Sequence, residues 1–395
     1  MKKSINDLKL KNKKVIMRVD FNVPVKEGVI TSNKRILAAL PTISKVVEEG
    51  GKLILLSHLG RVKEQADLKK NTLYPVAIEL ARLIGKPVHF VDKTRGIELE
   101  IAVNKLEKGE ILLVQNTRFE DLNEKAESKN NPELAKYWAS LADVYINDAF
   151  GAAHRAHAST AGIAEYVKES ALGYLMNNEV EKLSKLLNDS EKPFVAIIGG
   201  AKVSDKIKVL ENLVTVVDKI LIGGGMAYTF KKALGFEVGS SLLEQDYLEF
   251  AKDFMEKYSD KVLLPIDDLC AREFADVEPI YQEGNIEQGL MGLDIGPKTI
   301  KLFAETLKDA KTVFWNGPMG VTEFNNFTKG TLAVAEAIAE LQGKAYSVVG
   351  GGDSVAAVQK LKMVDSFSHV STGGGASLEL IEGKKLPGIE AIQDK

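Results

Sequence analysis

The hydrophobic pattern of the chain alternates between two periods. Short, nearly continuous apolar runs are separated by longer stretches in which apolar residues recur every three or four positions. Runs of the first kind are typical of buried parallel strands, and the second spacing is typical of amphipathic helices. In the first half, strands are predicted at residues 15–19, 53–56, 88–91, 111–114 and 144–146, and helices at residues 35–47, 74–84 and 132–141.

The second half repeats this alternation. Strands are predicted there at residues 194–198, 219–222, 262–266, 313–315, 346–349 and 369–371. Four of them run into a glycine pair or triplet that a predicted helix follows. Alternating strands and helices predict an α/β fold with parallel sheets covered on both faces. We therefore expect two Rossmann-like three-layer αβα domains.

A long amphipathic stretch, residues 174–191, lies between the two halves. Its apolar residues Leu175, Val180, Leu183 and Leu187 stand among polar neighbours. We interpret it as an interdomain helix and a candidate hinge. The 395 residues favour two or three domains. The predicted domains are residues 1–173 and residues 192–376.

The strongest chemical signal follows the predicted strand at residues 194–198. Gly199 and Gly200 end this strand, and residues 201–210 have helical spacing. Such a junction directs free backbone N–H groups and the positive end of a helix dipole at one point, which favours a phosphate or carboxylate. Lys202, Asp205 and Lys206 lie beside it, two cations and a carboxylate that could hold a metal ion. This set suits a phosphoryl group, although an ordinary solvated helix after a glycine turn explains the segment equally well.

Arginine and glycine are distributed unevenly along the chain. Seven of the eight arginines precede residue 160, whereas the glycine triplets at residues 223–225, 350–352 and 373–375 all lie in the second half. Arginine offers a rigid fork to carboxylates and phosphates, and glycine lets the backbone approach a polyphosphate closely. The two halves are therefore expected to bind anions in two different ways.

Polar side chains follow four predicted strands of the first half. They are Asp20, Asn22, His58, Arg61, Arg118 and Arg155. Ligands of open parallel sheets bind outside the carboxyl ends of the strands, so these loops could converge on one small anion. Arginines would hold its phosphate or carboxylate, and Asp20 and Asn22 its hydroxyl groups. A single such arginine could equally be an ordinary surface residue. His154 and His157 have no acidic neighbour in their loop, so we do not expect a metal there.

Composition narrows the class of protein. The chain is 45% hydrophobic and 27% charged, and 52 cationic against 55 acidic side chains give a net charge of −3. This balance does not favour nucleic acid or anionic membranes as partners. The single cysteine, Cys270, excludes an intramolecular disulfide. Neither a signal peptide nor an apolar run of about 18 residues is present, so we expect a cytoplasmic protein.

Two common nucleotide motifs are absent. The chain has no Gly-x4-Gly-Lys-Ser/Thr loop, and the sequence after residue 223 does not complete Gly-x-Gly-x-x-Gly. Several glycine-bearing helix starts around one crevice could still hold a diphosphate or triphosphate. Asp353 directly follows a glycine triplet and could reach a magnesium ion that phosphate oxygens and water also bind.

Taken together, the motifs of the chain resemble those of the phosphoglycerate kinase family over almost the whole length. The matching segments are RVDFNVP at residues 18–24, SHLGR at 57–61, NDAF at 147–150, HRAHAS at 154–159, GGAKV at 199–203, DIGP at 294–297, WNGPMG at 315–320 and GGGDS at 350–354. The resemblance implies reversible, Mg²⁺-dependent phosphoryl transfer from 1,3-bisphosphoglycerate to ADP, giving 3-phosphoglycerate and ATP, in glycolysis and gluconeogenesis. It also implies a monomer and a C-terminal segment, residues 377–395, that returns to the first domain.

The same resemblance implies which residues form the sites. Phosphoglycerate would be bound by Asp20, Phe21, Asn22, Arg35, His58, Leu59, Gly60, Arg61, Arg118 and Arg155. The nucleotide would be bound by Gly200, Ala201, Lys202, Lys206, Gly224, Gly292, Asn316, Pro318, Glu323, Gly351, Gly352, Asp353 and Ser354, with Asp353 nearest the metal. Arg35, Lys202 and the helix start at Gly373, Gly374 and Gly375 would act on the transferring group.

Two segments depart from the family pattern. Val62 stands where the family commonly has proline, and residues 92–95 are unlike the expected sequence, so Arg95 is expected at the surface. Two other classes of protein remain open at this level. One is a dehydrogenase or another nucleotide enzyme on the same kind of fold, and the other is a non-catalytic two-domain ligand-binding module.

Overall fold

The computed structural model describes residues 1–395, which form two compact units. The first unit contains Met1–Glu181 together with Lys385–Lys395, and the second contains Lys182–Lys384. Each is an α/β unit built on a six-stranded parallel sheet, which confirms the predicted fold class. No helix is long and apolar enough to span a membrane.

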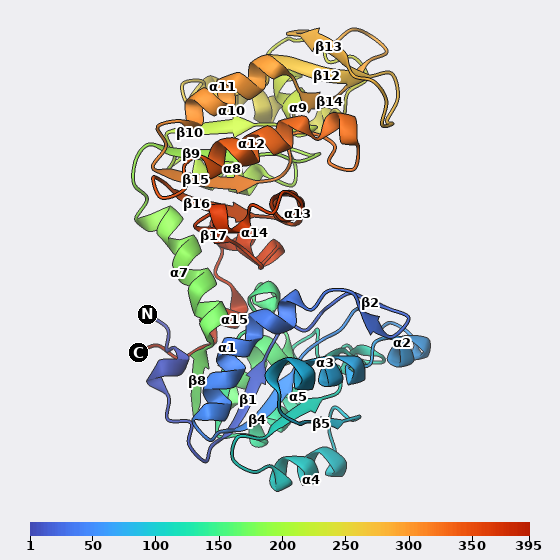
Figure 1. Ribbon diagram of the computed structural model, residues 1–395, viewed down its shortest axis with the longest axis vertical. Coiled ribbons are helices and arrows are strands. Elements are labelled where there is room, and N and C mark those ends of the chain that lie inside the picture. The colour runs from blue at the N-terminus through green and yellow to red at the C-terminus, as the bar shows by residue number, and fades with distance from the viewer. The chain divides into compact units, whose positions relative to one another are not determined.

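The sheet of the first unit has the strand order β5-β6-β4-β1-β7-β8. Figure 1 labels β5, β4, β1 and β8 of this sheet. Its strands are β1 (Lys14–Arg18), β4 (Lys52–Leu56), β5 (Val88–Val91), β6 (Ile111–Val114), β7 (Val144–Asn147) and β8 (Glu169–Leu172). Its helices are α1 (Lys34–Glu48), α2 (Gln65–Lys70), α3 (Tyr74–Ile84), α4 (Ile97–Lys105), α5 (Pro132–Ser140), α6 (Ile163–Tyr166) and α15 (Pro387–Glu390). Strand β8 was not predicted, because its sequence ESAL has no apolar run.

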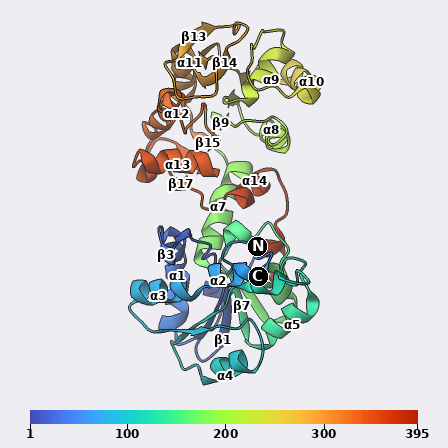
Figure 2. The ribbon, with the colours of Figure 1, turned by 90° about the vertical axis from the view of Figure 1, so that its right-hand side faces the viewer.

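Helices cover both faces of this sheet, which explains its continuous apolar strands. Val15 and Met17 of β1 share a core with Ile36 and Ile43 of α1. Ile16 points to the opposite face, because successive side chains of a strand alternate, and it too is fully buried. Figure 2 shows α1 and α3 on one side of the strands and α5 on the other.

The sheet of the second unit has the order β11-β10-β9-β15-β16-β17. Its strands are β9 (Phe194–Ile198), β10 (Lys219–Ile222), β11 (Val262–Leu263), β15 (Thr312–Asn316), β16 (Tyr346–Gly350) and β17 (His369–Val370). Its helices are α8 (Ile207–Leu213), α9 (Met226–Ala233), α10 (Leu248–Tyr258), α11 (Pro297–Leu307), α12 (Lys329–Ala339), α13 (Gly352–Lys360) and α14 (Gly375–Ile381). Helices α8, α9 and α10 lie on one side of the strands, and α11, α12 and α13 on the other (Figure 2).

Two small antiparallel elements were not predicted. The hairpin β2 (Val25–Lys26) and β3 (Val29–Ile30) belongs to the first unit. In the second unit β12 (Asp267–Ala271) pairs with both β13 (Ile280–Glu283) and β14 (Met291–Ile295). Charged and polar residues such as Asp267 and Gln282 interrupt the apolar pattern of these strands. The strand predicted at residues 262–266 ends at Leu263, where the chain turns toward this second sheet.

The glycine junctions agree with the sequence prediction at three places and differ at the fourth. The connections from β10 to α9, from β16 to α13 and from β17 to α14 each contain a glycine triplet, with Gly350 ending β16 and Gly352 and Gly375 beginning their helices. The helix predicted at residues 201–210 is wrong, because α8 begins only at Ile207. Gly200 has φ +140°, a conformation outside the helical region, and residues 201–206 form a loop. Lys202, Asp205 and Lys206 therefore lie on a loop and not on the first turns of a helix.

The long helix α7 (Tyr174–Asn188) belongs to the first unit up to Glu181 and to the second from Lys182. It ends three residues before the predicted limit at residue 191. The C-terminal residues from Lys385 pack in the first unit, where the Lys3 amide donates to the carbonyl of Gln393 at 2.8 Å. Residues 377–384 still belong to the second unit, so the returning segment is shorter than residues 377–395.

A buried ion pair lies at the base of the small antiparallel sheet. Nζ of Lys231 in α9 is 2.5 Å from Oδ2 of Asp268 in β12, and the two side chains are 2% and 1% exposed. Oδ1 of Asp268 has no hydrogen-bond partner. The pair thus holds two charges away from water, and its hydrogen bonds do not satisfy every oxygen of the carboxylate. Removal of either partner would leave an unpaired buried charge, which strongly destabilises a fold.

The variant Lys231→Met should lower the free energy of unfolding by about 3 to 5 kcal/mol, because it leaves the carboxylate of Asp268 buried without its cation. Urea unfolding followed by circular dichroism measures this loss. The double variant Lys231→Met/Asp268→Leu should recover most of it, since no buried charge remains. A loss below about 1 kcal/mol in the single variant would contradict this account of the pair.

Candidate active site

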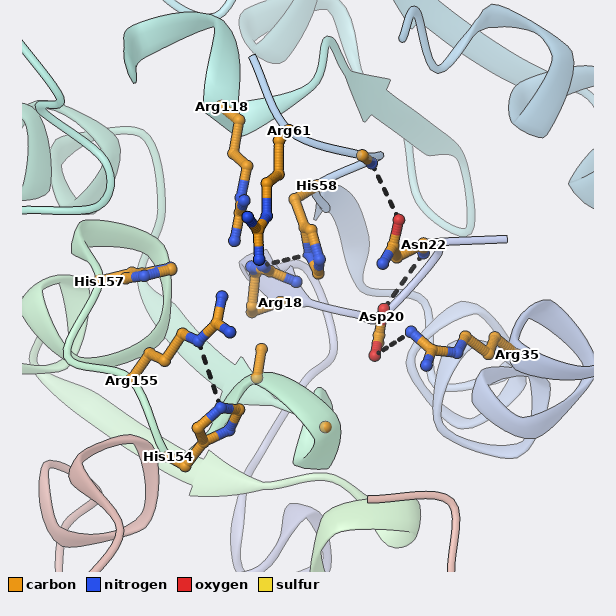
Figure 3. A pocket seen from close by; sticks show the side chains of 13 residues that line it. Arg18, Asp20, Asn22, Arg35, His58, Arg61, Arg118, His154, Arg155 and His157 are labelled. Carbon is orange, nitrogen blue, oxygen red and sulfur yellow. Dashed lines mark hydrogen bonds and ion pairs between the residues drawn. The ribbon is translucent and has the colours of Figure 1, made fainter. Parts of the chain in front are cut away.

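The first unit contains a cavity of about 250 Å³ at the carboxyl ends of its strands, which we call the arginine pocket. Its lining residues are Arg18, Asp20, Asn22, Arg35, His58, Gly60, Arg61, Arg118, Gly151, Ala152, His154, Arg155 and His157. The loops after β1, β4, β6 and β7 supply most of them, and Arg35 stands on the first turn of α1 (Figure 3). The structure thus brings together the polar residues that the sequence places after four separate strands.

Asp20 and Asn22 organise one side of the arginine pocket. Nη1 of Arg35 lies 2.8 Å from Oδ2 of Asp20, and the amide of Asn22 donates to Oδ1 of Asp20 at 3.1 Å. Oδ1 of Asn22 accepts from the amide of Gly60 at 2.9 Å. Burial acts to raise the pKa of Asp20, but its neighbours His58, Arg35 and Arg18, with the hydrogen bond from the Asn22 amide, hold that pKa below its ordinary value. Asp20 is therefore ionised and keeps Arg35 directed toward the cavity.

His58 is held in one protonation state by its neighbour. Nη2 of Arg18 lies 3.0 Å from Nδ1 of His58. A guanidinium can only donate, so Nδ1 accepts and the proton of the neutral ring is on Nε2. Burial, and then the charge of Arg18, lowers the pKa of His58 well below its ordinary value, in agreement with a neutral ring. His58 can therefore donate from Nε2–H to an oxygen in the cavity.

Cationic side chains dominate the lining of the pocket. Five arginines line it, whereas Asp20 is its single carboxylate. Nε of the buried Arg118 has no hydrogen-bond partner. Burial, followed by the charge of Arg155, lowers the pKa of Arg118, although an arginine remains charged at neutral pH. Because like charges converge here without matching carboxylates, the pocket is suited to a small ligand with several negative charges.

The lining differs in part from the residues that the sequence suggested. Phe21 and Leu59 do not line the cavity, and their side chains belong to the hydrophobic core. Arg18, His154 and His157 do line it and were not predicted as site residues. A charged residue at the carboxyl end of an apolar strand was the available signal for Arg18. The histidines lie in the loop that carries Arg155.

The second unit contains a larger cavity of about 460 Å³, which we call the glycine pocket. Its lining residues are Gly200, Ala201, Gly224, Gly225, Tyr228, Ser240, Leu242, Phe274, Met291, Gly292, Leu293, Pro318, Gly320, Val321, Thr322, Glu323 and Asp353. Apolar side chains form much of this wall, including Leu242, Phe274 and Leu293. A mainly apolar wall with a few polar groups at its edge is typical of sites for planar organic ligands.

Glycine is required where the loops around this pocket meet. Gly224 has φ +70°, and a Cβ there would lie 2.7 Å from the carbonyl oxygen of Gly200 and 3.0 Å from that of Pro318. A Cβ on Gly292 would lie 2.0 Å from the hydroxyl oxygen of Tyr228. Any other residue would therefore separate the loops that follow β9, β10 and β15, or displace Tyr228.

A polar network supports the wall of the glycine pocket from behind. Nζ of Lys206 donates to Oδ1 of Asn316, and Nδ2 of Asn316 donates to the carbonyl of Gly350 at 2.8 Å. The amide of Gly317 donates to Oγ of Ser354 at 2.6 Å. Burial lowers the pKa of Lys206, and the carboxylates of Asp205 and Asp353 offset this effect in part. Hydrogen bonds thus link the loop after β15 to the start of α13.

Several residues suggested for nucleotide binding are not in the lining of the cavity. Lys206, Asn316, Gly351, Gly352 and Ser354 lie in or beside the supporting network, and Lys202 is exposed on the loop before α8. Gly373, Gly374 and Gly375 open α14 and line neither the arginine nor the glycine pocket. The apolar wall was not predicted, because an isolated apolar residue in a sequence is more often part of the hydrophobic core than of a ligand site.

The glycine pocket offers few side chains that could bind a metal ion. No group of three or more histidine, cysteine or acidic side chains is arranged to hold one. Asp353 does present an exposed carboxylate at the rim of the pocket. Because Mg²⁺ that accompanies a nucleotide takes most ligands from phosphates and water, one such carboxylate fits this kind of site.

A pocket for a small polyanion on one α/β unit and a partly apolar pocket bounded by glycine loops on the other are the features of a phosphotransferase. The comparisons with known proteins agree with this class. The family model of phosphoglycerate kinase matches residues 5–384. The chain belongs to the phosphoglycerate kinase family.

Individual relatives support this assignment. The chain is 58% identical to a phosphoglycerate kinase of Mycoplasmopsis pulmonis over all of its own length, but it spans about half (52%) of that relative. It is 56% identical to the phosphoglycerate kinase of Mesomycoplasma hyopneumoniae, with 100% of this chain and 98% of the relative covered. The crystal structure of phosphoglycerate kinase from Pyrococcus horikoshii has a TM-score of 0.83 at 31% identity, covering 98% of both chains. The solved structure of phosphoglycerate kinase from Coxiella burnetii has a TM-score of 0.90 at 42% identity, covering 99% of this chain and 98% of that chain.

The arginine pocket should make the fold sensitive to acid through His157. Burial, together with the charges of Arg18 and Arg118, lowers the pKa of His157 from 6.5 to about 3. Below pH 6.5 the unfolded chain therefore binds a proton at His157 that the folded chain does not bind. The free energy of unfolding is highest, with respect to this group, above pH 6.5, and it decreases as the pH falls from there toward 3.

The variant His157→Gln should consequently lose less stability than the parent protein between about pH 7 and pH 5, by about 2 kcal/mol. Urea unfolding at the two pH values measures the difference. Burial raises the pKa of Asp148 to about 6 and that of Asp294 to about 7, which acts in the opposite direction. Both groups are present in parent and variant, so their effect cancels in the comparison. An equal loss in the two proteins would contradict the assignment to His157.

Proposed function

We propose that the protein transfers a phosphoryl group reversibly between 1,3-bisphosphoglycerate and ADP, giving 3-phosphoglycerate and ATP, as a step of glycolysis and gluconeogenesis. The arginine pocket would bind phosphoglycerate and the glycine pocket the nucleotide. The observation that carries this proposal is the lining of the arginine pocket, in which five arginines meet a single carboxylate. A triose that bears both a phosphate and a carboxyl group supplies the missing negative charges.

The residues around the pocket can be assigned to parts of this substrate. Four lining arginines have no carboxylate partner among the lining residues. Arg18 is already hydrogen-bonded to His58, so Arg61, Arg118 and Arg155 suit the phosphate group. Asp20 and Asn22 can bind the hydroxyl group, because both present oxygen acceptors at the rim. Arg35 on α1 is partly exposed, so it can turn from Asp20 to the carboxyl end of the substrate where the reaction takes place.

The proposed reaction requires no general base. The acceptor is a carboxylate in one direction and a phosphate oxygen of ADP in the other, and both are already ionised near pH 7. The main obstacle is the repulsion between an anionic nucleophile and an anionic phosphoryl group. Two unit charges about 4 Å apart repel by about 4 kcal/mol at an effective dielectric constant near 20. Positioning and positive charge therefore have to supply most of the rate enhancement.

Cations from both units would offset this repulsion. We assign the role to Arg35 on the phosphoglycerate side and to Lys202 on the nucleotide side, where Lys202 is exposed on a loop that can adapt. The start of α14 at Gly373, Gly374 and Gly375 would direct backbone N–H groups at the transferring phosphoryl group. Asp353 would hold the Mg²⁺ of the nucleotide. This ion supplies charge neutralisation between phosphate oxygens when it is bound.

The rest of the nucleotide would be held by the glycine pocket. Gly224, Gly292 and Pro318 bring backbone close to the base and ribose, and Glu323 lies at the rim, where it can accept from ribose hydroxyl groups. Lys206 would reach the phosphates after releasing Asn316. The burial of Lys206 favours this exchange, because a partly desolvated ammonium gains more from a phosphate than from a neutral amide.

Purified protein given 3-phosphoglycerate, ATP and MgCl₂ should form ADP at a rate that a coupled absorbance assay detects. Excess EDTA should abolish the rate, and restored Mg²⁺ should recover it. The reverse direction should form ATP from 1,3-bisphosphoglycerate and ADP. Turnover that depends on a nicotinamide cofactor and not on phosphoglycerate would indicate a dehydrogenase instead. Binding of both ligands without turnover would indicate a binding module.

The variant Arg35→Ala should lower kcat by roughly two or more powers of ten while changing the affinity for ATP less than about twofold, because the charge it removes acts on the developing transition state. Steady-state kinetics and calorimetric titration of ATP measure the two quantities. Arg82→Ala is a suitable control, since Arg82 pairs with Glu79 on the exposed face of α3, away from the pocket. Near-normal kcat in Arg35→Ala would remove Arg35 from the reaction.

A further inference from the structure

A chain of buried hydrogen bonds lies directly behind the arginine pocket. Nε of Arg18 donates to Oγ of Ser159 at 2.8 Å, and Oγ of Ser159 donates to Oε1 of Glu127. The amide of Ser159 donates to Oε2 of the same carboxylate at 3.0 Å. All three residues are fully buried. At the other end of the chain, Nη2 of Arg18 donates to Nδ1 of His58.

The chemistry of the groups fixes the direction of every bond. A guanidinium only donates and an ionised carboxylate only accepts, so the hydroxyl of Ser159 has to accept from Arg18 and donate to Glu127. The order Glu127, Ser159, Arg18, His58 therefore has one consistent set of proton positions. Its last member is the neutral His58 with a proton on Nε2, the atom that remains for a ligand in the pocket (Figure 3).

The charge of Arg18 also favours the ionised form of Glu127 at the buried end of this series of hydrogen bonds. Arg18 carries its charge at 0% exposure, which is costly without a nearby counterion. Burial raises the pKa of Glu127 above its ordinary value, and the charge of Arg18 and the two hydrogen bonds from Ser159 limit this rise. Both oxygens of Glu127 accept hydrogen bonds, as those of an ionised group do. Glu127 is thus a counterion for Arg18 that remains outside the pocket and does not compete with an anionic substrate.

The network connects loops that are remote in the sequence. Glu127 lies between β6 and α5, Ser159 follows the loop that carries Arg155, and Arg18 ends β1. Two further hydrogen bonds hold the same loops. The amide of Ala158 donates to the backbone carbonyl of Glu127 at 2.9 Å, and the hydroxyl of Tyr145 donates to the backbone carbonyl of Ser159 at 2.8 Å. Glu127 and Ser159, which lie in two different loops, therefore set the position of Arg18. Neither of their side chains lines the cavity.

We propose that Glu127 and Ser159 are positioning residues for phosphoglycerate, which hold Arg18 in place and through it keep His58 as an Nε2–H donor directed at the substrate. This inference rests on the proposed function of the arginine pocket. It assigns to two residues outside the cavity a role in the affinity for one substrate only. A purely structural role would instead alter stability without separating the two substrates.

The test compares Ser159→Ala and Glu127→Gln with the parent protein. Each variant should raise the KM for 3-phosphoglycerate roughly tenfold, because a hydrogen bond to a charged group is lost, and should leave the KM for ATP within about twofold. Ser128→Ala is the matched control. The amide of Ser128 donates to Asp121 at 2.8 Å and its hydroxyl contacts the same carboxylate, so it anchors the Glu127 loop without touching Arg18.

Two further measurements separate positioning from general damage to the fold. If both residues act through the same series of hydrogen bonds, the double variant Ser159→Ala/Glu127→Gln should raise the KM for 3-phosphoglycerate no more than the stronger single variant does. ¹⁵N NMR of the histidine rings, with the signal of His58 assigned from its loss in His58→Gln, should show one Nε2–H tautomer in the parent protein. In Ser159→Ala the ring should show both tautomers. The smaller substitution, Ser159→Ala, keeps the test available if Glu127→Gln does not fold.

The possible outcomes are distinct. An unchanged KM for 3-phosphoglycerate in a folded Ser159→Ala variant overturns the inference, and so does an equal rise in Ser128→Ala or in the KM for ATP. Additive effects in the double variant, or an unaltered His58 signal in Ser159→Ala, also overturn it. Failure of the proposed function would look different, because the parent protein would then show no turnover that depends on phosphoglycerate.

Discussion

The repulsion among the cations of the arginine pocket is the constraint on which the rest of the first unit depends. Five arginines converge there against one lining carboxylate, and such an arrangement opposes folding until an anion arrives. A parallel sheet can hold them together because the carboxyl ends of its strands meet at one edge while its covered faces supply the stability. Buried carboxylates placed behind the wall, such as Glu127, reduce the repulsion without filling the pocket.

The pocket of the second unit is built from backbone and apolar side chains, whereas that of the first unit is built from charged side chains. The glycine pocket is lined by glycine loops and apolar side chains, and Lys206 stands behind the wall, where it contacts Asn316. Glycines that allow three loops to approach closely, such as Gly224, cannot be replaced without separating them. A large ligand with a planar base gains most of its binding from such a shaped wall, whereas a small and highly charged triose needs localised cations. The two pockets therefore differ as their proposed ligands do.

Much of this architecture could be predicted from the sequence. Continuous apolar runs defined nearly every strand of the two parallel sheets, since both faces of those sheets are covered. The prediction failed where tertiary contacts override local pattern. The helix expected from residue 201 starts only at Ile207, because Gly200 and its neighbours approach the loop of Gly224. Strand β12 holds Asp267 and Asp268 in buried positions, so no apolar run marks it. Arg18 and the apolar wall of the glycine pocket were missed because only the fold brings them to a cavity.

Function and stability conflict most clearly in the wall of the arginine pocket. His157 is buried beside Arg18 and Arg118, and Nε of Arg118 has no partner, although each arrangement costs free energy of folding. Packing for stability alone would replace these groups with apolar ones, as buried charges can often be replaced without loss. A substrate that binds only to the folded chain raises the free energy of unfolding by mass action and so offsets part of this cost. The groups that weaken the empty pocket are thus those whose interactions become favourable when an anion with several charges is bound.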